Sequence, residues 1–291
     1  MSHRLTAAPA PTISLYLFME LVDIPYIADS KDRQLAFDLY SSPSATDGSM
    51  IVFVHGGAWG ADDKSAHQVC ARQLAIASHC PILVPNYRLT TKANGFRHPG
   101  HAEDILHFLE FLTIWDGIPD VFNPAGRGMY LLGQSCGAHI LSSIFLDSSA
   151  ISPTLTPSPL VLRATKGIAL SEGIFDIDLL LTRFPEYRDW FIAAAFGDQV
   201  SYADFSATLL PLREPESEHA SLRWLVIHST GDTLVDQPQS DAMYAHLRAL
   251  YGAAADAHVT RNIDQLDVEH DDVPVAPLFV ELIRAFVEGA Q

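Results

Sequence analysis

Cysteine is scarce in this sequence: among 291 residues there are only Cys70, Cys80 and Cys136. Three irregularly spaced cysteines do not form a disulfide framework, and they lack the spacing of a zinc site. Because structural disulfides accumulate in oxidising compartments, their scarcity favours a reducing one. We therefore expect a cytoplasmic protein.

Positive charge is also in short supply. Lysine and arginine together number 18 against 35 aspartates and glutamates, which gives a formal net charge of -17 at pH 7. Nucleic acids and anionic membrane surfaces are bound by clustered Lys and Arg that replace counterions. The composition therefore argues against both kinds of partner.

Long apolar runs are missing as well. No uninterrupted apolar segment approaches the roughly 20 residues that a membrane-spanning helix needs. Residues 1–23 contain one arginine and a short apolar patch, but prolines interrupt the start and acidic residues close the end, so this is a poor signal peptide. We expect residues 1–291 to form a single domain.

What the sequence does contain is an alternation of strand-like and helix-like segments. The predicted strands are residues 34–42, 50–57, 82–89, 128–135, 164–176, 222–232 and 258–264, and the predicted helices are 65–79, 101–115, 138–146, 240–250 and 276–288. This order predicts an α/β fold with a mostly parallel sheet, helices on both faces, and a site at the carboxyl ends of the strands. Between about 176 and 220 the pattern loosens, which indicates either a helical insertion that acts as a lid or a packing excursion without substrate contact.

A serine stands between two glycines where a predicted strand meets a predicted helix. The segment GQSCG places Ser135 directly after the apolar run MYLL. G-x-S-x-G in this context predicts a nucleophile elbow, in which a sharp turn lifts the serine hydroxyl clear of the sheet. A helix N-cap after a glycine turn is the alternative interpretation.

The motif HGGAWG, at the end of an earlier predicted strand, favours the nucleophile. Gly56 and Gly57 leave their backbone N–H groups accessible where an oxyanion would form, and the elbow adds the N–H of Cys136. Two motifs on different strands thus specify one acyl-transfer site. In the same motif, Trp59 is either part of an aromatic wall for a substrate ring or an anchor for the loop.

A serine nucleophile needs a base, and an acid that orients the base; in this kind of fold both follow the serine, acid first. Asp232 and Asp236 come directly after a late predicted strand. We favour Asp232, because Asp236 lies a turn further on, where it could cap the next helix. For the base, chain order selects His270 over His258, which begins a predicted strand and should lie at the opposite end of the sheet.

With these residues identified, the chain resembles the α/β-hydrolase superfamily and, within it, the HGG-type esterases related to hormone-sensitive lipase. The similarity runs through FDLY, HGGAWG, NYRL, the elbow, SEGIFD, HSTGDTLV and VEH. More narrowly, HGGAW, HSTGD and the late histidine are similar to the kynurenine formamidases (arylformamidases).

The resemblance implies hydrolysis of N-formyl-L-kynurenine to formate and L-kynurenine, in tryptophan breakdown towards NAD. It implies that Ser135 attacks the formyl carbon, that His270 takes the proton and returns one to the arylamine, and that Asp232 orients His270. No cofactor is needed, and the sequence has no His-rich metal motif of the kind found in the unrelated metal-dependent bacterial formamidases.

Two other functions compete with this one: a broad short-chain carboxylesterase, and a ligand-binding protein on a hydrolase scaffold that has lost catalysis. The second is disfavoured, because a serine, an acid and a late histidine are all present. The expected partner is a small aromatic formamide. Arg97, Lys92 and the acids of the insertion are candidates for binding its amino-acid head group. The oligomeric state stays open, with a homodimer as one candidate.

Overall fold

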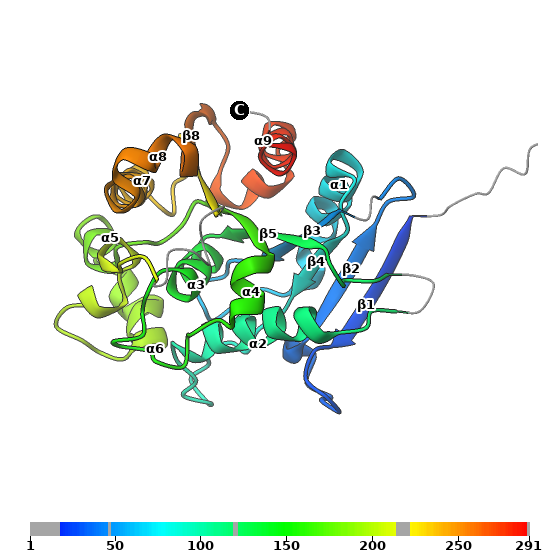
Figure 1. The fold of residues 1–291 in the computed structure, drawn as a ribbon. Coiled ribbons are helices and arrows are strands. Elements are labelled where there is room, and N and C mark those ends of the chain that lie inside the picture. Colours follow the sequence, from blue (N-terminus) through cyan, green and yellow to red (C-terminus); the bar gives the residue numbers. More distant parts are fainter. Residues whose placement is uncertain (1–17, 46–47, 119–121, 214–221, 290–291) are drawn as a thin grey trace, which may run out of the picture.

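The fold is described from a computed structural model over residues 18–45, 48–118, 122–213 and 222–289. Within these residues one eight-stranded sheet crosses the molecule, and helices cover it on both sides (Figure 1). The strands are β1 Met19–Pro25, β2 Ala36–Ser41, β3 Ser49–Val54, β4 Ile82–Pro85, β5 Gly128–Gln134, β6 Thr165–Ser171, β7 Arg223–Ser229 and β8 Val259–Leu266. The helices are α1 Gln68–Ser78, α2 Gly100–Ile114, α3 Cys136–Phe145, α4 Pro159–Ala164, α5 Ile177–Arg183, α6 Ala193–Phe196, α7 Gln237–Tyr251, α8 Ala255–His258 and α9 Pro277–Glu288.

The sheet has the order β1-β2-β4-β3-β5-β6-β7-β8. β2 is antiparallel to both of its neighbours, whereas every pair from β4 across to β8 is parallel. The expected mostly parallel α/β sheet is therefore confirmed. Because parallel strands run the same way, the loops that leave β3, β5, β6 and β7 emerge at one edge of the sheet.

The central strands bury both of their faces, as the continuous apolar runs predict. Along β3, Val52 and Val54 belong to a core shared with α2 and α3, whereas Ile51 and Phe53 belong to a second core under α1 and α9. Figure 1 shows α1 and α9 together on one side of the sheet and α2, α3 and α4 on the other. This double burial holds the strand ends that carry the site.

The edge strand β1 was not predicted. It pairs with β2 across an irregularity between Leu21 and Ile24, where Asp23 has a φ of 57°. All seven of its residues are at least partly exposed, so its apolar side chains do not form the continuous run of a buried strand.

None of the described helices is long and apolar enough to cross a membrane.

Short helical elements fill much of the stretch interpreted as an insertion. Between β6 and β7 the chain forms α5, a π-helical turn at Arg188–Ile192, and α6. Figure 1 places α5 and α6 on the side of the molecule away from β1. The rest of the predicted insertion includes residues 214–220, which lie outside the described residues.

Candidate active site

Ser135 sits in a strained turn between β5 and α3, with a φ of 55° and a ψ of -123°. The flanking glycines make the turn possible. A Cβ on Gly137 would lie 2.2 Å from the Val54 carbonyl oxygen, and one on Gly133 would lie 2.7 Å from the Ala138 backbone. Neither position accepts a side chain, which is why the elbow needs the G-x-S-x-G pattern. Strain of this kind is characteristic of functional sites.

The segment that follows β3, residues 55–62, is called the glycine loop below. It has an unusual concentration of positive φ angles: Gly57 97°, Ala58 52°, Trp59 58° and Asp62 80°. A Cβ on Gly57 would lie 2.2 Å from the Ala61 carbonyl oxygen, and one on Gly56 would lie 3.0 Å from the Cβ of Ser135. The two glycines therefore let the loop fold tightly against the serine.

Hydrogen bonds fix the glycine loop to its surroundings. The Tyr87 hydroxyl lies 3.1 Å from the His55 carbonyl oxygen and 2.9 Å from that of Gly56. The Trp59 N–H donates to the Cys136 sulfur at 3.3 Å. Burial raises the pKa of the Cys136 thiol to about 11, so the thiol is neutral at pH 7 and unsuited to nucleophilic attack.

The Trp59 ring is fully buried. It packs edge-on against His139 at 5.2 Å and Phe196 at 4.8 Å, and it lies 6.1 Å from Phe191, measured between ring centroids. Phe191 lines the cavity over Ser135, and Trp59 is not among the described residues of that lining. These contacts fit the anchoring interpretation of Trp59 better than a place on the substrate wall.

The candidate base and acid are in direct contact. His270 Nδ1 lies 2.7 Å from Asp232 Oδ2, while Asp232 Oδ1 accepts from the N–H groups of Leu234 at 2.8 Å and Val235 at 2.9 Å. Burial pushes the pKa of Asp232 upward, but the hydrogen bond and charge of His270 and the two backbone donors outweigh it, so the pKa lies below its usual value. Asp232 is therefore a carboxylate that can hold the His270 ring in one orientation.

The two alternatives, Asp236 and His258, make other contacts. Asp236 is the residue before α7 and makes no side-chain capping bond. His258 precedes β8, and its Nδ1 lies 2.7 Å from the carbonyl oxygen of Leu222, next to the start of β7. It is thus at the amino end of the parallel strands, opposite Ser135, as expected.

Glu172, which the sequence reasoning missed, is packed behind Asp232. It follows β6 directly, is fully buried and has a φ of 51°. The Ser229 N–H donates to Glu172 Oε1 at 2.9 Å. Burial, followed by the charge of Asp232 and a hydrogen bond to it, raises the pKa of Glu172 to about 9, so this carboxyl is protonated at neutral pH. Its place in SEGIFD, an acidic residue near the end of a predicted strand, was the available signal.

A cavity of about 380 Å³ opens onto Ser135 and His270. Its wall includes the glycine loop and aromatic residues of the insertion: Gly57, Ala58, Tyr187, Trp190 and Phe191. Lys92 and Asp271 add charge to the lining. The backbone near the base is also tied to the elbow, since Gln134 Nε2 donates to the His270 carbonyl oxygen at 3.3 Å.

Comparison with known proteins matches residues 51–264 to the family described as the alpha/beta hydrolase fold. A kynurenine formamidase from Meyerozyma guilliermondii is 27% identical over 201 residues, which cover 68% of this chain and 71% of that protein. A kynurenine formamidase-like hydrolase from Fusarium equiseti is 24% identical over 265 residues, covering 81% and 84%. The crystal structure of esterase B from Lactobacillus rhamnosis superposes with a TM-score of 0.68 at 17% identity, covering 94% of this chain and 87% of that one.

Proposed function

The chain belongs to the alpha/beta hydrolase fold family, and we propose that it is a serine hydrolase that cleaves N-formyl-L-kynurenine to formate and L-kynurenine. The mechanism rests on one observation. Ser135 and His270 line the same cavity, and the Nδ1 atom of His270 is hydrogen-bonded to Asp232. The kynurenine formamidases among the relatives support the choice of substrate.

In the first half of the reaction, the Ser135 hydroxyl attacks the formyl carbon and its proton passes to His270 Nε2. Asp232 keeps the proton on Nδ1 and stabilises the imidazolium that forms. When the tetrahedral intermediate collapses, the C–N bond breaks and His270 gives its proton to the arylamine nitrogen. L-kynurenine leaves, and the formyl group stays on Ser135 as an ester.

In the second half, a water molecule attacks the formyl ester while His270 accepts its proton, and formate is released as Ser135 regains its hydrogen. Both tetrahedral intermediates carry a negative oxygen. The backbone N–H groups of Gly56, Gly57 and Cys136 are the donors that we assign to it, because the glycine loop and the elbow are held against each other.

Glu172 acts in this scheme as a positioning residue. Because it is a neutral acid at pH 7, it donates a hydrogen bond to the Asp232 carboxylate instead of repelling it. Asp232 is then held from two sides, by Glu172 and by backbone N–H groups, while its remaining oxygen faces His270. The imidazole is thereby oriented before substrate arrives.

The cavity suits an aromatic leaving group. Tyr187, Trp190 and Phe191, all from the helical insertion, offer ring surfaces to an aryl amine, and this is the lid role that we assign to the insertion. Lys92 and Asp271 offer opposite charges to a zwitterionic head group. A formyl group is the smallest acyl unit, so selectivity has to come from the leaving amine.

We therefore expect kcat/KM for N-formyl-L-kynurenine to exceed that for p-nitrophenyl acetate or butyrate, although the esters are chemically more reactive. All three reactions can be followed by absorbance on one preparation, with Ser135→Ala as the blank. A methylene in an apolar pocket is worth only about 1 to 3 kcal/mol, so small esters should still react slowly. If the esters react faster, or butyryl is preferred over acetyl, the protein is a carboxylesterase.

A further inference from the structure

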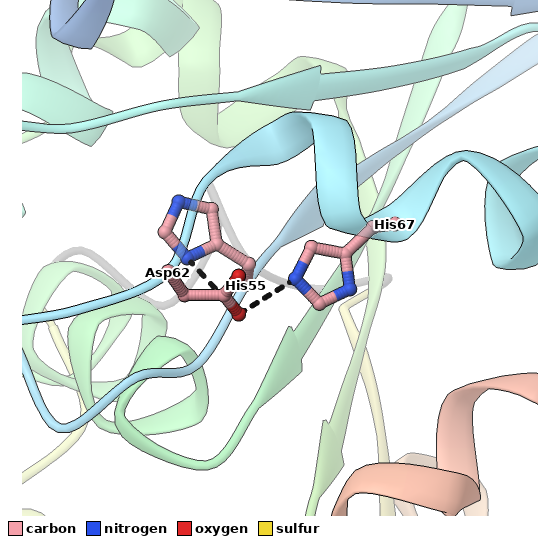
Figure 2. A group of neighbouring side chains, drawn as sticks. All are labelled: His55, Asp62 and His67. Carbon is pink, nitrogen blue, oxygen red and sulfur yellow. Dashed lines mark hydrogen bonds and ion pairs between the residues drawn. The ribbon is translucent and has the colours of Figure 1, made fainter.

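Three potential metal ligands lie close together: His55 and Asp62, the first and last residues of the glycine loop, and His67, five residues further along the chain (Figure 2). Asp62 Oδ2 lies 2.8 Å from His67 Nε2 and 4.0 Å from His55 Nδ1. The planes of the two imidazole rings are only 11° apart. Figure 2 shows the rings on either side of the Asp62 carboxylate, each with a nitrogen joined to the same oxygen by a dashed line.

We propose that His55, Asp62 and His67 form a binding site for a divalent transition-metal ion, with Zn²⁺ as the best match. Two imidazole nitrogens and one carboxylate oxygen are ligands that Zn²⁺ prefers, whereas Mg²⁺ and Ca²⁺ take oxygen ligands. Tetrahedral Zn²⁺ with bonds of roughly 2.0 to 2.2 Å holds its ligand atoms roughly 3.3 Å apart. The observed separations of 2.8 and 4.0 Å from Asp62 lie on either side of that value, and all three ligand atoms lie within 4.8 Å of one another. Side-chain movements would therefore complete the site.

The surroundings provide access and support. Asp62 and His67 line a second cavity of about 450 Å³, from which a water molecule can supply the fourth ligand. Asp62 Oδ1 accepts from the Asp63 N–H at 2.7 Å, which leaves Oδ2 for the ion. Without metal, His55 Nδ1 lies within hydrogen-bond distance of the Gly56 carbonyl oxygen, at 2.9 Å. When Nδ1 binds the ion instead, this oxygen still accepts a hydrogen bond from the Tyr87 hydroxyl.

A second cluster of potential ligands, Glu172, His228 and Asp232, does not compete for this assignment. Both carboxylate oxygens of Asp232 are already hydrogen-bonded, Oδ2 to His270 and Oδ1 to two backbone N–H groups, and Glu172 is a neutral acid bonded to Asp232. The site at His55, by contrast, takes neither the acid nor the base as a ligand, although His270 lines the same second cavity. An ion bound to it would join the first and last residues of the glycine loop and so restrain the backbone that carries Gly56 and Gly57.

Calorimetric titration of the full-length protein with Zn²⁺, in the absence of substrate, tests the proposal. We expect one ion to bind per chain and the thermal unfolding temperature to rise, because a ligand that binds only the folded state stabilises it. Mg²⁺ should produce neither effect. Asp62→Asn and His67→Ala should each weaken Zn²⁺ binding by about tenfold or more, since even outer-shell changes cost about 10- to 100-fold.

His107→Ala is the matched control, because His107 is an exposed histidine on α2 outside the cluster, and its loss should leave Zn²⁺ binding unchanged. Circular dichroism of each variant without metal verifies its fold, and the isosteric Asp62→Asn decides the question if His67→Ala does not fold. Absence of Zn²⁺ binding to the wild type, or undiminished binding to the folded cluster variants, would overturn the proposal. No substrate is present, so the outcome is independent of the reaction proposed above.

Discussion

Ser135→Ala should abolish turnover of N-formyl-L-kynurenine while leaving the fold intact. Loss of a triad nucleophile lowers kcat by on the order of 10⁶, because the base has no hydroxyl to activate and no formyl-enzyme can form, so that only the weak residual catalysis of the oxyanion donors is left. The turn itself should persist, since the close approaches at Gly133 and Gly137 shape it and the serine hydroxyl does not cap α3. Steady-state kinetics measure the loss, and thermal unfolding monitors the fold. Retention of more than about a tenth of the activity is incompatible with a serine mechanism.

Asp232→Asn should have the next largest effect and lower kcat by about 10⁴. The carboxylate accepts from His270 Nδ1 at 2.7 Å, and an amide in its place can present an N–H that favours the wrong imidazole tautomer. Nucleophile activation then fails, although the histidine is still present.

Asp236→Asn makes the same chemical change four residues later in the chain and is the matched control for Asp232→Asn. Asp236 precedes α7 without a capping bond from its side chain, so we expect its kcat to stay near that of the wild type. Kinetics of both variants on one substrate give the ranking. If Asp236→Asn proves the more damaging, Asp232 does not orient the base.

The mostly parallel sheet and the contacts around Ser135 were accessible to sequence reasoning because each leaves a local signal. The elbow glycines are imposed by backbone contacts within a few residues or with one neighbouring strand. Chain order then selects His270 as the base and limits the acid to Asp232 or Asp236, of which position after the strand favours Asp232. The edge strand β1 gave no such signal, since all of its residues are at least partly exposed and an irregularity interrupts its pairing with β2.

Features that depend on packing between distant segments could not be predicted from local sequence patterns. Glu172 is a partner of Asp232 only because β6 and β7 are adjacent, and Trp59 lies behind Phe191 only because the insertion folds over it. His55 and His67 do not match a short metal motif. They meet because the intervening loop turns back through several positive φ angles.

Mass spectrometry after treatment with a sulfonyl fluoride or an organophosphate gives the most direct measurement of whether Ser135 is the nucleophile. We expect a stoichiometric adduct on the peptide that contains Ser135, formed in step with the loss of activity. Ser135→Ala should remain unlabelled, and Asp232→Asn should be labelled more slowly, because the base is no longer held in the productive tautomer. Inactivation with the adduct on Cys136 or on any other residue, or full activity after labelling of Ser135, would contradict the proposed mechanism.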